Sequence, residues 1–275
     1  MRLTLGYSPC PNDTFIFGAL ANGLLDTKGI DFDIVLDDVE ALNKMAFAHK
    51  LDVTKLSYHA FAHLTADYKL LHAGSALGNN CGPLLVARQP LTDAQIEHAR
   101  IAIPGKMTTA NFLLGLAFPK AVHKSEVLFS DIEEAVCSGQ FDAGLIIHEN
   151  RFTYEQKGLV KLMDLGEFWE RTTAMPIPLG GIVVKKELDH EVQQTVNQLI
   201  RESVEFAYAH TDQVMPYIRH HAQAMEDAVM QAHIDLYVNE YSVDLGPKGR
   251  HAVRSMFEMA REKGLIGAMN SDFFV

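Results

Sequence analysis

His148 is the residue whose type and position most directly suggest chemistry. It follows the wholly apolar run at residues 144–147 and begins the segment His-Glu-Asn. An imidazole at the end of a buried strand would emerge at the sheet edge, and its pKa near neutrality suits it to accept a proton at about pH 7. A single histidine can equally cap a backbone group. His148 is therefore a candidate general base, with a structural cap as the alternative.

The segment at residues 104–110, PGKMTTA, joins a predicted strand to a predicted helix and suggests anion binding. The first N–H groups of a helix lack intrahelical partners and favour a carboxylate or phosphate by roughly 0.3–1 kcal/mol when exposed. Thr108 and Thr109 add hydroxyl donors, and Ala110 follows them. One threonine could instead be an ordinary helix cap. The segment has the pattern of neither a Walker loop nor a Rossmann fingerprint.

Lys55, Leu56 and Ser57 end a third predicted strand. Ser57 would place a hydroxyl and a backbone N–H at the strand end, although a serine there often caps the next helix. The side chain of Lys55 points away from that of Leu56, so it either contacts a ligand or faces solvent.

The first predicted strand ends in the segment SPCPND at residues 8–13. Its prolines fix the backbone, which suits the wall of a binding site and equally a rigid loop. We expect Asn12 or Asp13 to cap a helix that begins near Thr14. Cys10 has no charged neighbour and is interpreted as a buried or pocket-lining thiol.

The other histidines give no metal site. His59 and His63 are four residues apart, but no third ligand has a typical spacing, so we expect them on a helix surface. We expect His220, His221 and His233 on polar, solvated helix faces.

Strands and helices alternate in the order typical of parallel α/β sheets. Everything after Asp189 is predicted to be helical. The sequence thus predicts an α/β protein of two open lobes, residues 1–88 with 182–275 and residues 89–181, with ligands at the strand ends in a shared cleft. The predicted strands are 3–8, 31–36, 52–56, 83–88, 100–104, 127–129, 141–147 and 178–186, and the predicted helices include 39–49, 58–64, 132–138, 192–210, 214–221, 224–237 and 248–263.

Bulk composition narrows the class of protein. The chain has 275 residues, 48% of them hydrophobic, and a net charge of -11, which disfavours nucleic-acid binding but allows a small anionic ligand in a local pocket. Three cysteines without metal spacing indicate reduced thiols. We expect no signal peptide and no membrane span, and hence a cytoplasmic protein.

The segments SPCPNDTFIF, DVTKLSYHA, IPGKMTTANFLL and GLIIHENRFTY together resemble the 1,4-dihydroxy-6-naphthoate synthases of the futalosine route to menaquinone. The resemblance runs from Leu5 to about Phe274. It implies a two-lobed fold like that of type II periplasmic binding proteins and a lyase without metal or organic cofactor. Such an enzyme converts cyclic dehypoxanthinyl futalosine into 1,4-dihydroxy-6-naphthoate and releases the sugar-derived fragment.

The resemblance also implies site residues. His148 corresponds to the general base, and the substrate contacts fall on Lys55, Leu56, Ser57, Thr109 and Ala110, with Thr108 adjacent. The expected partner is a small-molecule carboxylate substrate, with no nucleic acid and no membrane.

A solute-binding protein for a small carboxylate is the alternative, because this fold also serves transport. A binding protein would return its ligand unchanged. The sequence leaves open the oligomeric state and whether Ser8, Asn12 or Asn43 touches the ligand.

Overall fold

The computed structural model describes residues 1–222 and 226–275, which form two compact α/β units. The first unit comprises Met1–Gly78 and Pro178–Val275, and the second comprises Asn79–Ile177. The chain therefore enters the second unit earlier than the expected residue 89 and leaves it before the expected residue 182. The entry is earlier because the strand within the expected segment 83–88 pairs with strands of the second unit. The exit is earlier because the strand at Ile177–Lys185 pairs with strands of the first unit.

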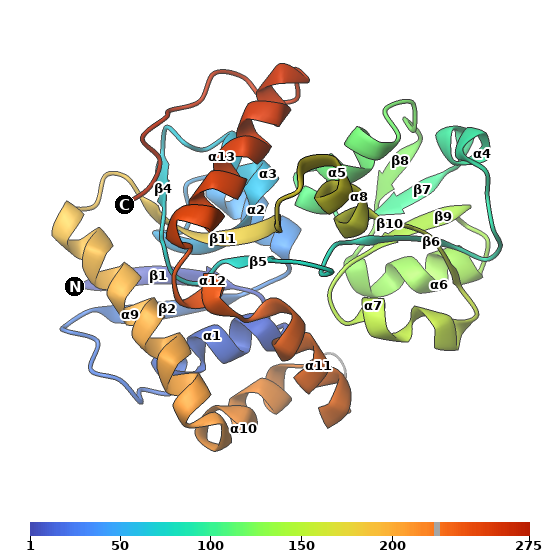
Figure 1. Cartoon of the computed structure of the whole chain (residues 1–275). Helices are drawn as coiled ribbons and strands as arrows, with labels where there is room; N and C mark the ends of the chain where they lie inside the picture. The colour runs from blue at the N-terminus through green and yellow to red at the C-terminus, as the bar shows by residue number, and fades with distance from the viewer. Residues whose placement is uncertain (223–225) are drawn as a thin grey trace. The chain divides into compact units, whose positions relative to one another are not determined.

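One mixed sheet organises the first unit (Figure 1). The two neighbours of β1 run parallel to it, as expected from the strand–helix alternation, whereas β11 runs antiparallel to both β3 and β4. In spatial order the strands are β2 (Asp31–Leu36), β1 (Arg2–Tyr7), β3 (Val53–Ser57), β11 (Ile177–Lys185) and β4 (Tyr68–Leu70), and β5 (Ala76–Gly78) also pairs with β11.

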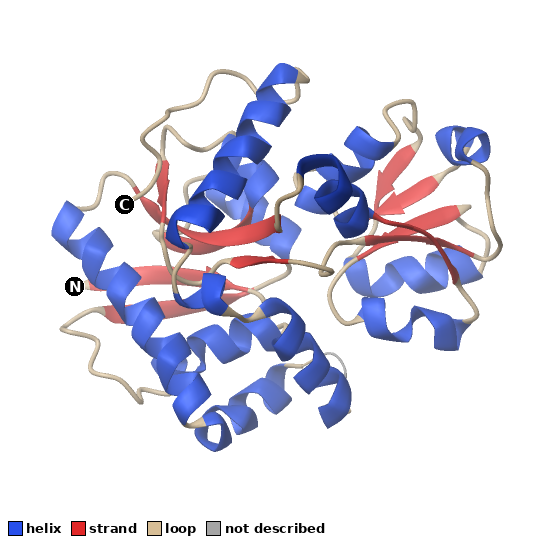
Figure 2. Ribbon diagram, in the orientation of Figure 1, coloured by secondary structure: helices blue, strands red, loops and turns tan. Residues whose placement is uncertain are grey.

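Helices cover both faces of this sheet (Figure 2). On one face α1 packs against α9, α10 and α11 over a core that includes Leu5, Phe15, Ile16 and Val204. The helices α2, α3 and α13 lie on the other face. The bounds are α1 (Pro11–Ala21), α2 (Val39–Phe47), α3 (Tyr58–Ala62), α9 (His190–Ala209), α10 (Thr211–His221), α11 (Asp227–Tyr237), α12 (Glu240–Val243) and α13 (Gly246–Glu262).

Helix α1 begins three residues earlier than expected. Its N-cap is Cys10, and Pro11 is the first helical residue, where its fixed φ suits the helix and its missing N–H costs nothing. The prediction that Asn12 or Asp13 caps the helix is therefore wrong. Both lie within the first turn, and their side chains are available for other partners.

The second unit has its own mixed sheet and its own core. Helix α6 packs on β7 and β9, and α8 packs on β6 and β10. In spatial order the strands are β10 (Val160–Asp164), β6 (Leu84–Ala87), β9 (Ala143–Ile146), β7 (Ile101–Ile103) and β8 (Lys124–Glu126). The helices are α4 (Asp93–His98), α5 (Thr109–Ala117), α6 (Ile132–Cys137), α7 (Asn150–Thr153) and α8 (Leu165–Thr173), with 3-10 turns η1 (Phe129–Asp131) and η2 (Tyr154–Lys157).

Some predicted elements differ from the observed ones. The strand predicted at 127–129 is wrong, because β8 lies just before it and pairs parallel to β7. The sequence pattern did not predict the strands β4, β5 and β10 or the helices α4, α7, α8 and α12. The start of the helix predicted at 224–237 lies partly outside the described residues.

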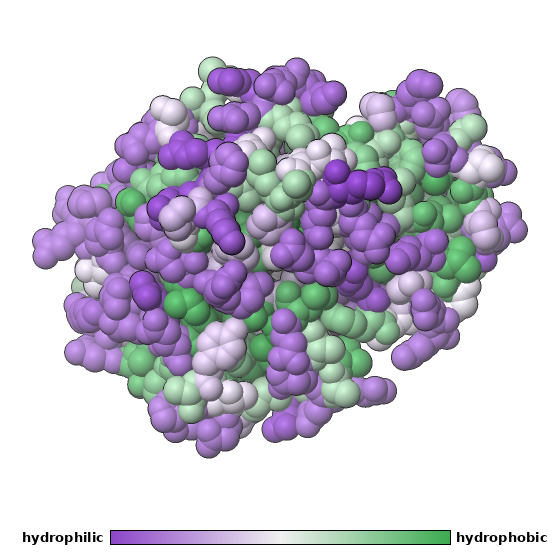
Figure 3. All heavy atoms as spheres, in the orientation of Figure 1, coloured by the Kyte–Doolittle hydropathy of each residue, from purple (hydrophilic) through white to green (hydrophobic). Residues whose placement is uncertain are grey.

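The surface of the described chain carries few large apolar side chains. Polar and apolar residues are interspersed on the face that Figure 3 shows. None of the described helices has the length and apolar character needed to cross a membrane.

Candidate functional site

Ser57 ends β3 and is held by a buried amide. The backbone N–H of Ser57 donates to Oδ1 of Asn43 at 3.1 Å, and Nδ2 of Asn43 lies 3.3 Å from Ser57 Oγ and 3.0 Å from Glu40 Oε2. Asn43 is fully buried on α2. Ser57 occupies the N-cap position of α3, but its side chain makes no capping bond. Asn43 therefore fixes the strand end at which we expected a ligand contact.

Lys55 is buried, so the solvent-facing alternative is excluded. Its side chain is 7% exposed, and its Nζ donates to Oδ1 of Asp13 at 2.7 Å. The neighbouring Leu56 is completely buried. On the neighbouring strand β11, a Cβ at Gly180 would lie 3.2 Å from Lys55 Cε and 2.7 Å from the carbonyl oxygen of Leu56. A glycine in β11 thus makes room for the lysine stem.

Asp13 is the centre of a buried polar network. The backbone N–H and the hydroxyl of Ser8 both donate to its Oδ2, at 3.1 and 2.8 Å. Nδ2 of Asn12 donates to its Oδ1 at 2.8 Å, beside the Lys55 ammonium. Oδ1 of Asn12 lies 2.9 Å from Nε2 of His233. The segment SPCPND therefore joins β1 and α1 to β3 and α11.

His233 corrects the expectation of a solvated histidine, because it is completely buried on α11. A usable signal was in the sequence: Met230, His233, Ile234 and Tyr237 recur at helical spacing and form the buried face of α11. Cys10 is 1% exposed, which confirms that it is a buried thiol.

The start of α5 contains the predicted threonines. The hydroxyl of Thr108 donates to the carbonyl oxygen of Gly105 at 2.8 Å and accepts the N–H of Asn111 at 3.2 Å. Thr108 is thus the helix cap that sequence analysis offered as the alternative. Thr109 and Ala110 are the first two helical residues and are buried, so the helix start is present as expected.

His148 lies in a turn two residues beyond the end of β9. It is half-buried, and its ring meets the ring of Phe129 edge-on at a centroid distance of 5.1 Å. Its φ of 57° is in the left-handed region, which costs a non-glycine residue about 1–3 kcal/mol and persists only where the surroundings impose it.

Contacts of the residues that follow His148 supply that constraint. Nδ2 of Asn150 donates to the carbonyl oxygen of Phe129 at 3.3 Å. The guanidinium of Arg151 donates to the carbonyl oxygen of Gly82 and to Oδ2 of Asp164, both at 2.6 Å. Asp164 is buried and also caps α8. Arg151 therefore ties the His148 turn to the loop before β6 and to the start of α8.

Two further titratable groups near these elements are perturbed by burial. Burial raises the pKa of Glu149, which is adjacent to His148. Burial raises the pKa of the Cys81 thiol to about 12, so this thiol is protonated and unreactive at neutral pH.

The predicted site residues thus form two groups, one in each unit. Lys55, Leu56 and Ser57 adjoin the Asp13 and Asn43 networks in the first unit. In the second unit, Thr108, Thr109 and Ala110 start α5, and His148 lies in the turn after β9.

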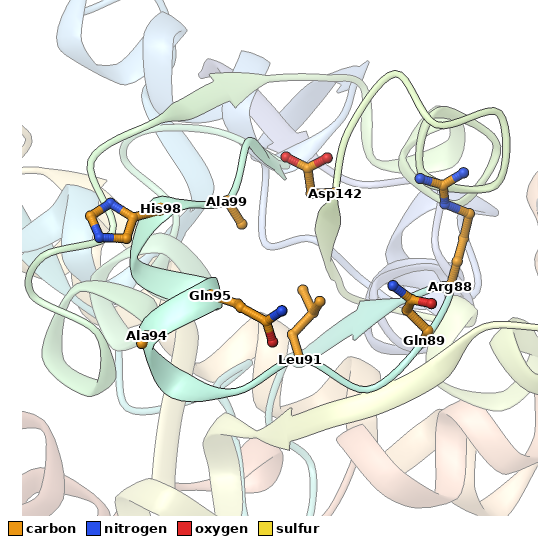
Figure 4. A pocket seen from close by; sticks show the side chains of 8 residues that line it. All are labelled: Arg88, Gln89, Leu91, Ala94, Gln95, His98, Ala99 and Asp142. Atoms are coloured by element: carbon orange, nitrogen blue, oxygen red, sulfur yellow. The ribbon is translucent and has the colours of Figure 1, made fainter.

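A hollow in the second unit contains none of these residues. Its volume is about 790 Å³, and Figure 4 shows its lining side chains, which come from the end of β6, the following loop, α4 and the approach to β9. Asp142 in this lining is paired with Arg100 at 2.9 Å, so its charge is already neutralised. Its lining residues are Arg88, Gln89, Leu91, Ala94, Gln95, His98, Ala99 and Asp142.

Residues 3–262 match a protein family described as menaquinone biosynthesis. The chain belongs to this family. It is 44% identical over 273 residues to a protein of Thermus thermophilus named 1,4-dihydroxy-6-naphthoate synthase, covering 99% of each chain. It is 41% identical to a protein of the same name from Streptomyces coelicolor, covering 98% of this chain and 96% of the relative. The resemblance found in the sequence motifs is thereby confirmed.

Solved structures of other proteins superpose on this chain and identify its fold. A protein of Archaeoglobus fulgidus superposes with a TM-score of 0.91 and 34% identity, covering 96% of this chain and 98% of that protein. The alkanesulfonate-binding protein of Xanthomonas axonopodis superposes with a TM-score of 0.73, covering 97% and 94%, at only 14% identity. This second likeness shows the fold alone, and it confirms the predicted periplasmic-binding-protein-like fold class.

Proposed function

We propose that this protein is a 1,4-dihydroxy-6-naphthoate synthase of menaquinone biosynthesis. The observation that carries the proposal is its identity of 44% and 41%, over nearly the full length, to two proteins of that name. The reaction proposed is the conversion of cyclic dehypoxanthinyl futalosine into 1,4-dihydroxy-6-naphthoate with release of the sugar-derived fragment, a carbon–carbon lyase reaction.

In the proposed mechanism neutral His148 removes a proton from the bound substrate. Carbon–carbon cleavage follows, and formation of the aromatic ring drives the reaction forward without an electron acceptor or organic cofactor. A positioned base typically supplies about 10²–10⁴ in rate. Support comes from the left-handed turn and its anchors through Asn150 and Arg151, because strained backbone held by its surroundings is common at active sites.

The substrate contacts are proposed to lie in both units. The start of α5 suits the aromatic carboxylate, because the N–H groups of Thr109 and Ala110 are at the helix N-terminus, where the dipole favours an anion. The hydroxyl of Thr108 holds the turn in place. In the first unit, Lys55, Leu56 and Ser57 are the proposed contacts.

We place the reaction in the cytoplasm as part of the same proposal. The three cysteines, Cys10, Cys81 and Cys137, are free thiols, which is typical of proteins in a reducing compartment. The proposed partner is a small-molecule carboxylate substrate.

The test is turnover by the purified protein. Incubation with cyclic dehypoxanthinyl futalosine should yield 1,4-dihydroxy-6-naphthoate, detected by chromatography and mass. A solute-binding protein, the function of several fold relatives, would bind the compound and return it unchanged, and that result would refute the proposal.

His148→Asn tests the assigned base. Asparagine tolerates the left-handed conformation and stays polar, but it cannot accept the proton. We expect substrate binding to persist and the single-turnover rate to fall by about two or more orders of magnitude. His98→Asn, an exposed histidine on α4 of the same unit, is the matched control and should leave the rate unchanged. A near-normal rate in His148→Asn would remove His148 from the mechanism.

A further inference from the structure

The carboxylate of Asp13 is saturated with hydrogen bonds. It accepts the N–H and hydroxyl of Ser8 on one oxygen, and the amide of Asn12 and the ammonium of Lys55 on the other. A carboxylate has about four lone-pair sites. Asp13, whose side chain is 2% exposed, therefore has no free site at which to accept a substrate proton or hydroxyl.

Lys55, unlike Asp13, has more hydrogen-bonding groups than partners. Its ammonium carries three N–H donors, and Asp13 is its one acceptor among residues 1–222 and 226–275. A buried donor without an acceptor is costly, so two directions around this nitrogen are suited to further oxygen atoms. A Cβ at Gly180 would lie 3.2 Å from Lys55 Cε, so the glycine leaves room for the lysine stem to reach Asp13.

Asn12 and His233 fix Asp13 from the far side. Because Nδ2 of Asn12 donates to Asp13, its Oδ1 must accept, and Nε2 of the completely buried His233 must carry the donated proton. The imidazole thereby sets the amide orientation. The chain of bonds runs from His233 through Asn12 and Asp13 to Lys55.

We propose that Asp13 is a positioning residue that, held by Asn12 and His233, aims the two remaining donors of Lys55 at a neutral oxygen of the substrate's sugar-derived part. The Lys55–Asp13 pair has no net charge, so it favours a hydroxyl or carbonyl oxygen over a carboxylate, for which the start of α5 is the proposed site. This inference rests on the proposed function and deepens it by dividing substrate recognition between the two groups of residues.

The test compares substrate with product, because 1,4-dihydroxy-6-naphthoate retains the carboxylate and lacks the sugar-derived fragment. In Asp13→Asn and in Lys55→Gln, we expect the KM for substrate to rise tenfold or more, while the Kd for the product changes less than twofold. His233→Leu should shift KM in the same direction, and His233→Gln, which keeps a donor, should shift it less.

A double variant separates positioning from a merely structural role. If Asp13 acts through Lys55, then adding Asp13→Asn to Lys55→Gln should not raise KM further. The double variant also carries no uncompensated ammonium, so it should fold even if Asp13→Asn alone does not. Asp52→Asn is the matched control: it removes another Lys–Asp pair, with Lys185 at 3.0 Å, from the same sheet, and should leave KM unchanged.

Several results would overturn the inference. An unchanged KM in Asp13→Asn, additive effects in the double variant, or an equal loss of product affinity would each do so while leaving the synthase function intact. If the wild-type protein forms no naphthoate, the proposed function fails first, and the inference falls with it.

Discussion

Replacing Arg151 by methionine should both destabilise the second unit and slow the reaction. Arg151 and Asp164 form an ion pair whose side chains are 16% and 1% exposed. Removing one partner of a buried pair typically costs about 3–5 kcal/mol. Asp164 would keep two backbone bonds, from the N–H groups of Gly166 and Glu167, so we expect the lower end, about 3 kcal/mol.

The expected consequences can be measured separately. A loss of about 3 kcal/mol corresponds to a fall in Tm of about 6–12 °C for a protein of this size. Loss of the bond to the carbonyl oxygen of Gly82 should loosen the His148 turn and lower kcat by about tenfold, with KM little changed. Thermal unfolding and steady-state kinetics on the same preparation report the two effects.

Two comparison variants separate the loss of stability from the loss of kcat in Arg151→Met. The double variant Arg151→Met with Asp164→Asn removes both charges of this pair and keeps the cap of α8. It should therefore regain most of the lost Tm but not the lost kcat. Arg100→Met removes an exposed pair, with side chains 57% and 39% exposed, and should leave the Tm almost unchanged, because solvent screens such a pair. A Tm of Arg151→Met within 2 °C of the wild type, or a full recovery of kcat in the double variant, would refute the positioning of His148 by Arg151.

Two further predictions follow from other contacts. Thr109→Val should weaken substrate binding by about 1–3 kcal/mol, measured as KM, because it removes a hydroxyl at the start of α5 that is proposed to donate to the substrate carboxylate. Thr92→Val, at the exposed cap of α4, is the control. An unchanged KM for Thr109→Val would assign Thr109 a structural role only. Burial opposes the ionised form of Asp52, but hydrogen bonds from Thr4 and Lys185 outweigh burial and leave the pKa of Asp52 below its usual range. Ionised Asp52 therefore stabilises the fold above about pH 4, and this stabilisation is lost as the pH falls through the lowered pKa. Chemical denaturation of Asp52→Asn should therefore show a weaker loss of stability below pH 4 than the wild type, and an identical pH dependence would contradict this assignment.

Several strands next to the site residues could be predicted from the sequence, because their apolar runs are long or end in polar groups. The expected strand at 31–36 coincides with β2, and the strand expected at 52–56 differs from β3 by one residue at each end. The strands β4 and β5 span three residues each, too few for a periodic pattern to identify them. The antiparallel direction of β11 also has no local signature, because it depends on the return of the chain from the second unit.

The conformation of His148 could not be predicted for a different reason. A left-handed residue is normally signalled by glycine or asparagine, and His148 is neither. Its backbone is held by partners whose positions depend on the tertiary fold, such as Phe129 and, through Arg151, Asp164. The sequence could therefore indicate an imidazole after an apolar strand, but not the turn that orients it.

The segment SPCPND shows how local stiffness and distant partners act together. Pro9 and Pro11 restrict the backbone so that Ser8 and Asp13, five residues apart, meet through two hydrogen bonds. That local arrangement still leaves two acceptor sites on Asp13, and one of them is filled by Lys55, 42 residues away. The prolines alone would fit a rigid loop, whereas the buried lysine with unused donors favours a binding role for the same segment. Lys55 therefore distinguishes a binding segment from a rigid loop, and its substitution is the decisive measurement for this part of the molecule.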